Sequence, residues 1–107
     1  MKIPVNADLL DGLVLALLNQ QDNYGYAITQ AMQAAIPVSE STLYPVLRRL
    51  KKAGLVITYD HPFQGRNRRY YQITDPGKER LTEVTAEWNH YKQQLDQIFK
   101  GGNQEYE

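Results

Sequence analysis

The chain contains no cysteine, and this absence excludes two kinds of structure. Without thiols there is no disulfide framework and no thiolate metal site. His61 and His90 are the only imidazoles, and they are 29 positions apart, which is not the spacing of a ligand pair. The sequence therefore predicts no metal and no cofactor, and the lack of cysteine fits a cytoplasmic protein.

Long hydrophobic runs are also missing. The longest, "LVLALL" at positions 13–18, is far shorter than the ~20 residues of a membrane span. No basic stretch precedes it in the manner of a signal peptide. We therefore expect a soluble protein without membrane contact.

Catalytic motifs are the third absence. The sequence has no nucleophile beside a base, no pair of carboxylates with a cleft signature and no glycine-rich phosphate loop. With 107 residues, 42% of them hydrophobic, the chain suits one small domain with a modest core. We expect this domain not to be an enzyme.

Net charge is zero, but the charges are unevenly distributed. Positions 48–69 hold seven basic residues and one acidic residue, a balance of +6, whereas positions 75–107 hold four basic and seven acidic residues, a balance of −3. Such asymmetry is typical of a nucleic-acid-binding face on a neutral protein. Charge alone equally allows a solvated helix face followed by a basic loop.

Two helices are expected before the basic region. The first carries six apolar residues between Leu9 and Leu18, is capped by Asn6 or Asp8 and ends before "NQQDN". The second has an apolar stripe from Ile28 to Ile36, with Asn23 as its predicted cap, and it ends at Pro37.

The third helix lies in "SESTLYPVLRRLKKAG" at positions 39–54. Its apolar residues recur with helical spacing at Leu43, Val46, Leu47 and Leu50, and Gly54 follows in the position of a left-handed C-terminal residue. Pro45 lacks an N–H and fits without cost only in a first turn, which predicts Thr42 as the cap instead of Ser39 or Ser41. An irregular first turn is expected.

A hairpin and a long helix complete the chain. "LVITY" and "RRYYQIT" have strand composition, and the turn formers "DHPFQGRN" between them, His61 included, predict a long basic tip. Thr74 caps a last helix that runs to about Phe99. The predicted fold is mainly α (α+β), with a DNA-binding domain at 1–74, a dimerisation helix at 75–100 and a flexible tail at 101–107.

Three helices followed by a hairpin is the order of a winged helix-turn-helix, in which the third helix enters the major groove and the hairpin touches the backbone. A recognition helix needs small polar side chains at its start and cations toward the flanking phosphates. The alternative is that the serines only cap the helix. The predicted DNA contacts are Ser39, Ser41, Thr42, Tyr44, Arg48, Lys52, Arg66, Asn67, Arg68 and Arg69.

The last helix carries an apolar seam with heptad spacing. A seam of this kind requires a partner helix, which could be supplied by its own domain or by a second chain. We favour a homodimer, because the first helix of so small a domain already needs cover. The predicted interface residues are Leu81, Val84, Trp88, Tyr91, Leu95 and Ile98.

Three segments, "DNYGYAITQAM", "SESTLYPVLRRLKKAGLV" and "GRNRRYYQITDPGKERL", resemble the PadR-like transcriptional regulators, and the likeness runs from about Leu9 to Phe99. The short length and single C-terminal helix resemble the small branch of that family, which includes a lactococcal multidrug-responsive repressor. The resemblance implies a dimeric repressor that binds a roughly palindromic operator in double-stranded DNA.

The resemblance also implies release from the operator by a small planar aromatic or phenolic ligand. Trp88, in "TAEWNHYKQQL", matches the tryptophan that lies at the dimer centre of the multidrug-responsive relative, and Gly12, Leu13 and Ala16 match first-helix residues near that pore. A tryptophan on such a seam is otherwise more often simple packing. The competing hypothesis for the whole chain is a winged-helix module that binds protein and not DNA.

Overall fold

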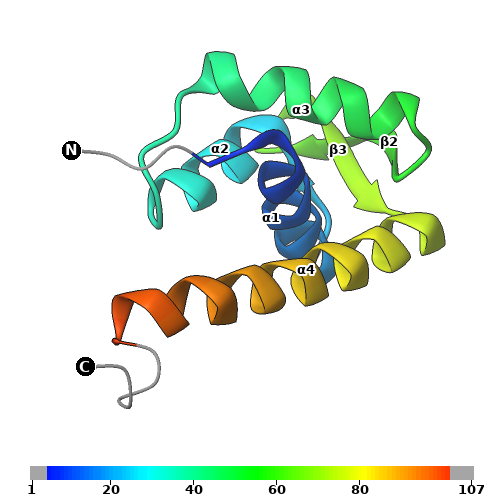
Figure 1. Ribbon diagram of the computed structural model, residues 1–107. Helices are drawn as coiled ribbons and strands as arrows, with labels where there is room; N and C mark the ends of the chain where they lie inside the picture. The colour runs from blue at the N-terminus through cyan, green and yellow to red at the C-terminus, as the bar shows by residue number, and fades with distance from the viewer. Residues whose placement is uncertain (1–4, 102–107) are drawn as a thin grey trace.

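The structure is a computed structural model and describes residues 5–101. Figure 1 shows short helices packed together, a small antiparallel sheet at one side of them, and a long C-terminal helix that crosses beneath. The elements, in chain order, are α1 (Ala7–Gln20), β1 (Asn23–Tyr24), α2 (Gly25–Gln33), α3 (Glu40–Lys52), β2 (Val56–Phe63), β3 (Arg66–Ile73) and α4 (Asp75–Phe99).

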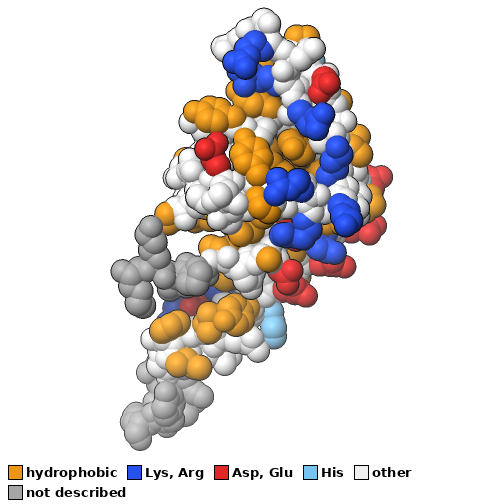
Figure 2. Space-filling view, turned by 90° about the horizontal axis from the view of Figure 1, so that it is seen from above, with side chains coloured by type: hydrophobic (Ala, Val, Ile, Leu, Met, Phe, Trp, Pro, Cys, Tyr) orange, Lys and Arg blue, Asp and Glu red, His pale blue; other side chains and the backbone are white. Residues whose placement is uncertain are grey.

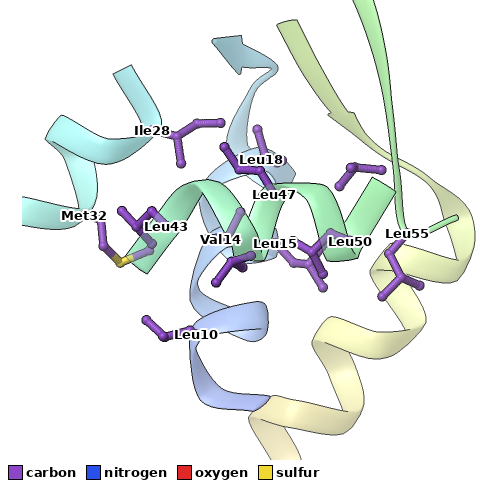
Figure 3. Packing of buried hydrophobic residues seen from close by; sticks show 12 residues of the cluster. Leu10, Val14, Leu15, Leu18, Ile28, Met32, Leu43, Leu47, Leu50 and Leu55 are labelled. Carbon is purple, nitrogen blue, oxygen red and sulfur yellow. The ribbon is translucent and has the colours of Figure 1, made fainter. Parts of the chain in front are cut away.

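The hydrophobic core forms where α1, α2 and α3 meet. Figure 3 shows the leucines of α1 and α3 pointing toward one another, with Ile28 and Met32 of α2 closing one side. On the sheet side Leu55 and Val56 complete the cluster, and Tyr71 and Ile73 pack against it. The apolar stripes predicted for α1 and α3 are therefore faces that meet in the core. The prediction for α2 is correct only in its first half: Ile28 and Met32 are buried, but the helix ends at Gln33 and not at Pro37.

Asn6, one of the two predicted caps, begins α1: its side chain accepts a hydrogen bond from the Leu9 N–H at 2.8 Å. The helix then continues to Gln20, slightly beyond its predicted end. The predicted cap of α2 is wrong. Asn23 lies in β1 and accepts from its neighbour Tyr24, which is the residue that precedes α2.

A third strand was not predicted. The two residues of β1 pair with Tyr70 and Tyr71 of β3, so the sheet order is β1-β3-β2. A two-residue strand is too short to show period-2 alternation, so no pattern in the sequence could reveal it. Its effect is to attach the segment between α1 and α2 to the inner strand of the hairpin.

The start of α3 differs from the expectation. Ser39 is the cap and accepts from the Thr42 N–H at 3.2 Å, so Thr42 is inside the helix and Pro45 lies in the second turn. Pro45 is exposed, and its ring occupies the outer face of the helix. The Ser41 carbonyl that it leaves without a helical donor is on that exposed face, where water can satisfy it. Gly54, with φ 77°, adopts the predicted left-handed conformation.

The hairpin has a short turn and not the predicted long tip. β2 and β3 pair along their whole length, from Val56 opposite Ile73 to Phe63 opposite Arg66. Only Gln64 and Gly65 form the turn, and both have positive φ, as a two-residue hairpin turn of type I′ requires. His61 therefore lies within β2 and packs edge-on against Tyr70.

The last helix has its predicted bounds. Thr74 caps it by accepting from the Gly77 N–H at 3.1 Å, Asp75 and Pro76 follow, and the helix ends at Phe99. In Figure 1 its first half lies against α1 and its second half extends beyond α1. Among the described residues, no helix combines the length and apolar character that a membrane crossing requires. Most of the predicted tail, residues 102–107, lies outside the described residues.

Gly77 marks the closest approach of α4 to the sheet. A Cβ at this position would meet the Leu55 carbonyl and would lie 2.7 Å from Ile73 Cγ1. We expect Gly77→Ala to lower the free energy of unfolding by roughly 1–3 kcal/mol, because the backbone of Leu55 has to move. Urea denaturation measures this, with Lys78→Ala at the next, exposed position as control. Equal stabilities of the two variants would refute the close contact.

Candidate nucleic-acid interface

The outer face of α3 is polar and basic. Ser41, Arg48 and Lys52 are all exposed and follow one another at helical spacing, with Pro45 between the first two. Figure 2 views the molecule from above, the side of α3, and shows Lys and Arg side chains over the upper half and right side of the molecule, with hydrophobic side chains between them. The folding of the chain thus brings the basic side chains of α3 and the hairpin to one side.

At the start of α3, three predicted contact residues form a hydroxyl cluster. Ser39 Oγ lies 2.9 Å from Ser41 Oγ and 3.0 Å from Thr42 Oγ1, and all three residues are exposed. Ser39 also caps the helix, so the capping role and an exposed hydroxyl coexist. A hydroxyl can rotate to donate or accept, which suits contacts with phosphates and with base edges alike.

Tyr44 is less available than its neighbours. It is half-buried and packs against the core. A Cβ at Gly25 would lie 3.0 Å from Tyr44 Cε1, so the tyrosine ring covers the first turn of α2. The main contribution of this ring is to packing between α2 and α3.

Arg49 is a residue of this region that the sequence did not single out. Its Nη2 donates to Oδ1 of Asp11, and the two groups form an ion pair between α3 and α1. The Asp11 side chain is only 7% exposed, whereas that of Arg49 is 45% exposed. The one sequence signal was a lone carboxylate within the apolar first helix, which indicates a buried charge that needs a partner.

The start of β3, next to the hairpin turn, presents three exposed polar residues. Arg66, Asn67 and Arg69 are all exposed, and Arg69 Nε lies 4.0 Å from Asp60 Oδ1, both side chains being more than half exposed. An ion pair of that length in water contributes little and is easily exchanged for another anion. These side chains are therefore free to meet a phosphate backbone.

Arg68 is held by aromatic rings. Its guanidinium carbon lies 4.6 Å from the ring centroid of Tyr24 and 5.6 Å from that of Phe63, and its Nε is buried without a hydrogen-bond partner. Tyr70 extends the cluster, with its ring edge-on to Tyr24 at 5.5 Å. Arg68 therefore joins the hairpin to β1 through cation–π contacts, a role that the run of arginines in the sequence did not reveal.

A carboxylate adds a second attachment on the same face of the sheet. Asp22 Oδ2 accepts from Tyr59 Oη at 2.6 Å and from Gln72 Nε2 at 3.0 Å. The hydrogen bond to Asp22 is the main reason that the pKa of Tyr59 is raised to about 12, with burial and the negative charge of Asp22 adding to it. The phenol therefore remains a hydrogen-bond donor throughout the physiological range.

The predicted seam of α4 divides into two parts. Val84 is 8% exposed and lies over Gly12 of α1, and Leu81 packs against the core, so both are covered within the chain. Further along, Leu95 is half-buried, and Trp88, Tyr91 and Ile98 are 40%, 55% and 77% exposed. Only this second part offers an apolar surface to another molecule.

The predicted ligand residues of α1, which are Gly12, Leu13 and Ala16, are buried or half-buried in the single chain. Gly12 is buried beneath Val84. A Cβ added at position 12 would lie 3.0 Å from the Cβ of Val84, so this glycine faces Val84 and not Trp88. Leu13 is half-buried and packs against the core, and Ala16 is half-buried. The small residue at position 12 thus serves close packing of α1 and α4.

A basic third helix beside a two-stranded basic hairpin defines the molecule as a winged helix-turn-helix protein, with the hairpin as its wing. The chain belongs to the PadR-like family of transcriptional regulators, whose model matches residues 14–83. This confirms the predicted family and agrees with the prediction of a non-enzyme. Its membership of the small multidrug-responsive branch stays a prediction.

Three similar proteins each match more than four fifths of this chain. The crystal structure of smu.1704 from Streptococcus mutans has 43% identity and a TM-score of 0.88, over 97% of this chain and 98% of that one. A PadR-like transcriptional regulator from Bacillus cereus has 30% identity and a TM-score of 0.79, over 85% and 91%. An uncharacterized protein X from Lysinibacillus sphaericus is 35% identical over 86% of this chain and 89% of its own length.

The cation–π contacts of Arg68 predict unequal effects of two neighbouring substitutions. Arg68→Met keeps the aliphatic stem but loses the charge over the rings, so we expect unfolding free energy to fall by roughly 0.5–2 kcal/mol. Arg69→Met, at an exposed position, should change it by less than about 0.5 kcal/mol. Urea denaturation of both variants tests this, and equal effects would show that Arg68 is not held by the rings.

Proposed function

We propose that this protein is a dimeric DNA-binding repressor that places α3 in the major groove of its operator and its wing on the adjacent backbone. The observation that carries the proposal is the gathering of exposed cations from α3 and the wing on one side of a PadR-like winged helix. Such a surface attracts phosphates through a long-range, salt-sensitive interaction. A regulator of this kind works in the cytoplasm.

The proposed contact residues of α3 and the wing can be assigned to bases or to phosphates from their positions. Ser41 and Arg48 lie on the outer face of α3 and can reach base edges, arginine preferring the two acceptors of guanine. Ser39 and Thr42 lie at the helix start, where hydroxyls and backbone N–H groups suit a phosphate, and Lys52 suits the phosphates at the other end. In the wing, Arg66, Asn67 and Arg69 are the exposed candidates for the backbone or a narrow minor groove.

The competing function, a module that binds protein, fits this surface less well. The core of a protein-binding patch is usually depleted in charge and enriched in aromatic residues. Here the α3 face combines Arg48, Lys51 and Lys52 with small hydroxyl residues, while the exposed aromatic residues lie on α2, β2 and α4. The distribution of charge therefore favours a polyanionic partner for α3.

DNA binding is tested by comparing salt dependence among variants. Removing one phosphate contact lowers the slope of log affinity against log salt by about one. We expect Arg69→Ala to do so on every duplex, whereas Ser41→Ala should mainly change the preference among sequences. Fluorescence anisotropy with DNA from upstream of the protein's own gene, and with an unrelated duplex, measures both effects.

The control for this experiment is Lys100→Ala, which removes the same charge from the far end of α4. Its salt slope should equal that of the unaltered protein. If Arg69→Ala behaves in the same way as this control, the wing does not contact DNA. If the unaltered protein binds no duplex at low salt, the proposed function is wrong.

Dimerisation is proposed from the uncovered part of α4. Trp88, Tyr91 and Ile98 continue at seam spacing beyond the point where α1 ends its contact, and aromatic side chains of this size are costly to leave in water. A second copy can bury both uncovered surfaces at once in a two-fold arrangement. The two-fold symmetry implies a roughly palindromic operator with half-sites about 34 Å, or a multiple of one turn, apart.

Ile98→Asp tests the dimer without disturbing the monomer. Because Ile98 is 77% exposed in the single chain, a carboxylate there is harmless unless a partner covers it. If a partner does, burial of an unpaired charge costs several kcal/mol, so the dissociation constant of the dimer should rise by roughly a hundredfold. Sedimentation measures this, with Gln93→Asp on the opposite face as control. A dimer unchanged by Ile98→Asp would place the interface elsewhere.

The proposal includes control of DNA binding by a small aromatic ligand. In its favour, Trp88 is 40% exposed and lies at the beginning of the uncovered part of α4, where two copies would bring two indoles together. The space expected above Gly12 is filled by Val84, so any ligand site has to form around Trp88 of two chains. To release DNA, such a ligand must bind more tightly to a dimer whose recognition helices are wrongly spaced.

A further inference from the structure

Asp11 is a negatively charged residue in a position where DNA binding gives no obvious use for it. It lies in the second turn of the mainly apolar α1 and, counted over the whole residue, is 5% exposed. A buried carboxylate is tolerated when a cation pairs with it, and Arg49 of α3 donates to its Oδ1. The pair therefore joins the body of the domain to the helix that carries the proposed base contacts.

The apolar contacts of α3 alone control its orientation only loosely. Leucine side chains can repack in alternative rotamers with little loss of buried area, so they resist separation more than rotation. A charge-assisted hydrogen bond has a defined length and direction. Arg49 lies at the flank of the buried stripe, where such a bond opposes rotation of α3 about its own axis.

Small rotations matter because base contacts are short. A rotation of about 20° moves an atom about 6 Å from the helix axis by about 2 Å. Hydrogen bonds span only ~2.7–3.2 Å between heavy atoms, so a movement of that size breaks them. Arg48 and Ser41 would be displaced by such a rotation because they lie on the outer face of α3, away from the core.

We propose that Asp11 is a positioning residue for DNA recognition: through Arg49 it fixes the orientation of α3, and operator binding therefore requires this buried negative charge. The inference rests on the proposed function. Arg49 serves in this role as the partner of Asp11 and not as a phosphate contact, although it lies in the most basic part of the sequence.

Whether DNA binding becomes weaker or stronger when Asp11 loses its charge separates this positioning role from a purely electrostatic effect. DNA is a polyanion, so loss of a carboxylate that acts only by its charge strengthens binding. Asp11→Asn keeps the size of the side chain but removes the charge that holds Arg49. We expect it to weaken operator binding on the order of tenfold, the size of coupling found between contacting groups.

The matched control is Asp8→Asn, which removes the same charge from an exposed position of the same helix. It should leave operator affinity unchanged or slightly increased. Arg49→Gln should weaken binding like Asp11→Asn, and the double variant should bind no more weakly than the weaker single variant, because the two residues act as one unit. The salt slope of Arg49→Gln should match that of the unaltered protein, whereas Lys52→Gln, at a position suited to a phosphate contact, should lower the slope by about one.

Loss of folding is excluded by circular dichroism and thermal unfolding of each variant, with affinities measured at least ten degrees below the lowest melting temperature. Operator binding by Asp11→Asn as tight as that of Asp8→Asn, additive effects of the two substitutions, or a reduced salt slope for Arg49→Gln would each overturn the inference. These outcomes leave the proposed function intact, since that fails only if the unaltered protein binds no DNA.

Discussion

Because α1 is apolar around most of its circumference, it can be kept from water only if other elements cover it on several sides. α2 and α3 cover one side, where Val14, Leu15 and Leu18 are almost completely buried, and α4 covers another through Val84. This double burial joins the part of the chain proposed to read DNA to the part proposed to dimerise. Asp11 and Gly12, adjacent in sequence, face α3 and α4 respectively, so a single turn of α1 contacts both.

The sequence was most informative where one face of an element is buried. The apolar residues of α1, α2 and α3 have helical spacing because each helix packs against the same core. The bounds of α4 were predicted correctly because the Thr74 cap and the glycines after Phe99 are local signals. Local signals failed where a tertiary contact decided the outcome. Asn23 is a good cap residue, but pairing of β1 with β3 places it in a strand. Pro45 is tolerated in a second turn because its face of α3 is exposed.

The sequence predicted which types of residue make up the site, but not which of the arginines are exposed and which are held by contacts within the chain. Ser41, Arg48, Arg66 and Arg69 are exposed, as the sequence suggested, whereas Arg68 and Arg49 are held by partners 44 and 38 positions away along the chain. A run of arginines gives no sign of which one will stack on a ring. The heptad seam has the same ambiguity, since the spacing of Val84 and of Ile98 is identical although one is covered by α1 and the other is uncovered.

The two cationic elements, α3 and the wing, are attached to the rest of the domain by different contacts. The wing is attached to β1 by the rings around Arg68 and by Asp22, neither of which touches α4. α3 is attached to α1 by the ion pair between Arg49 and Asp11. α4 packs against the next residue of α1, Gly12, through Val84. α4 also follows β3 directly in the chain and packs at Gly77 against Leu55 and Ile73, at the base of the wing. A shift of α4 would therefore reach both cationic elements, the recognition helix through α1 and the wing through β3.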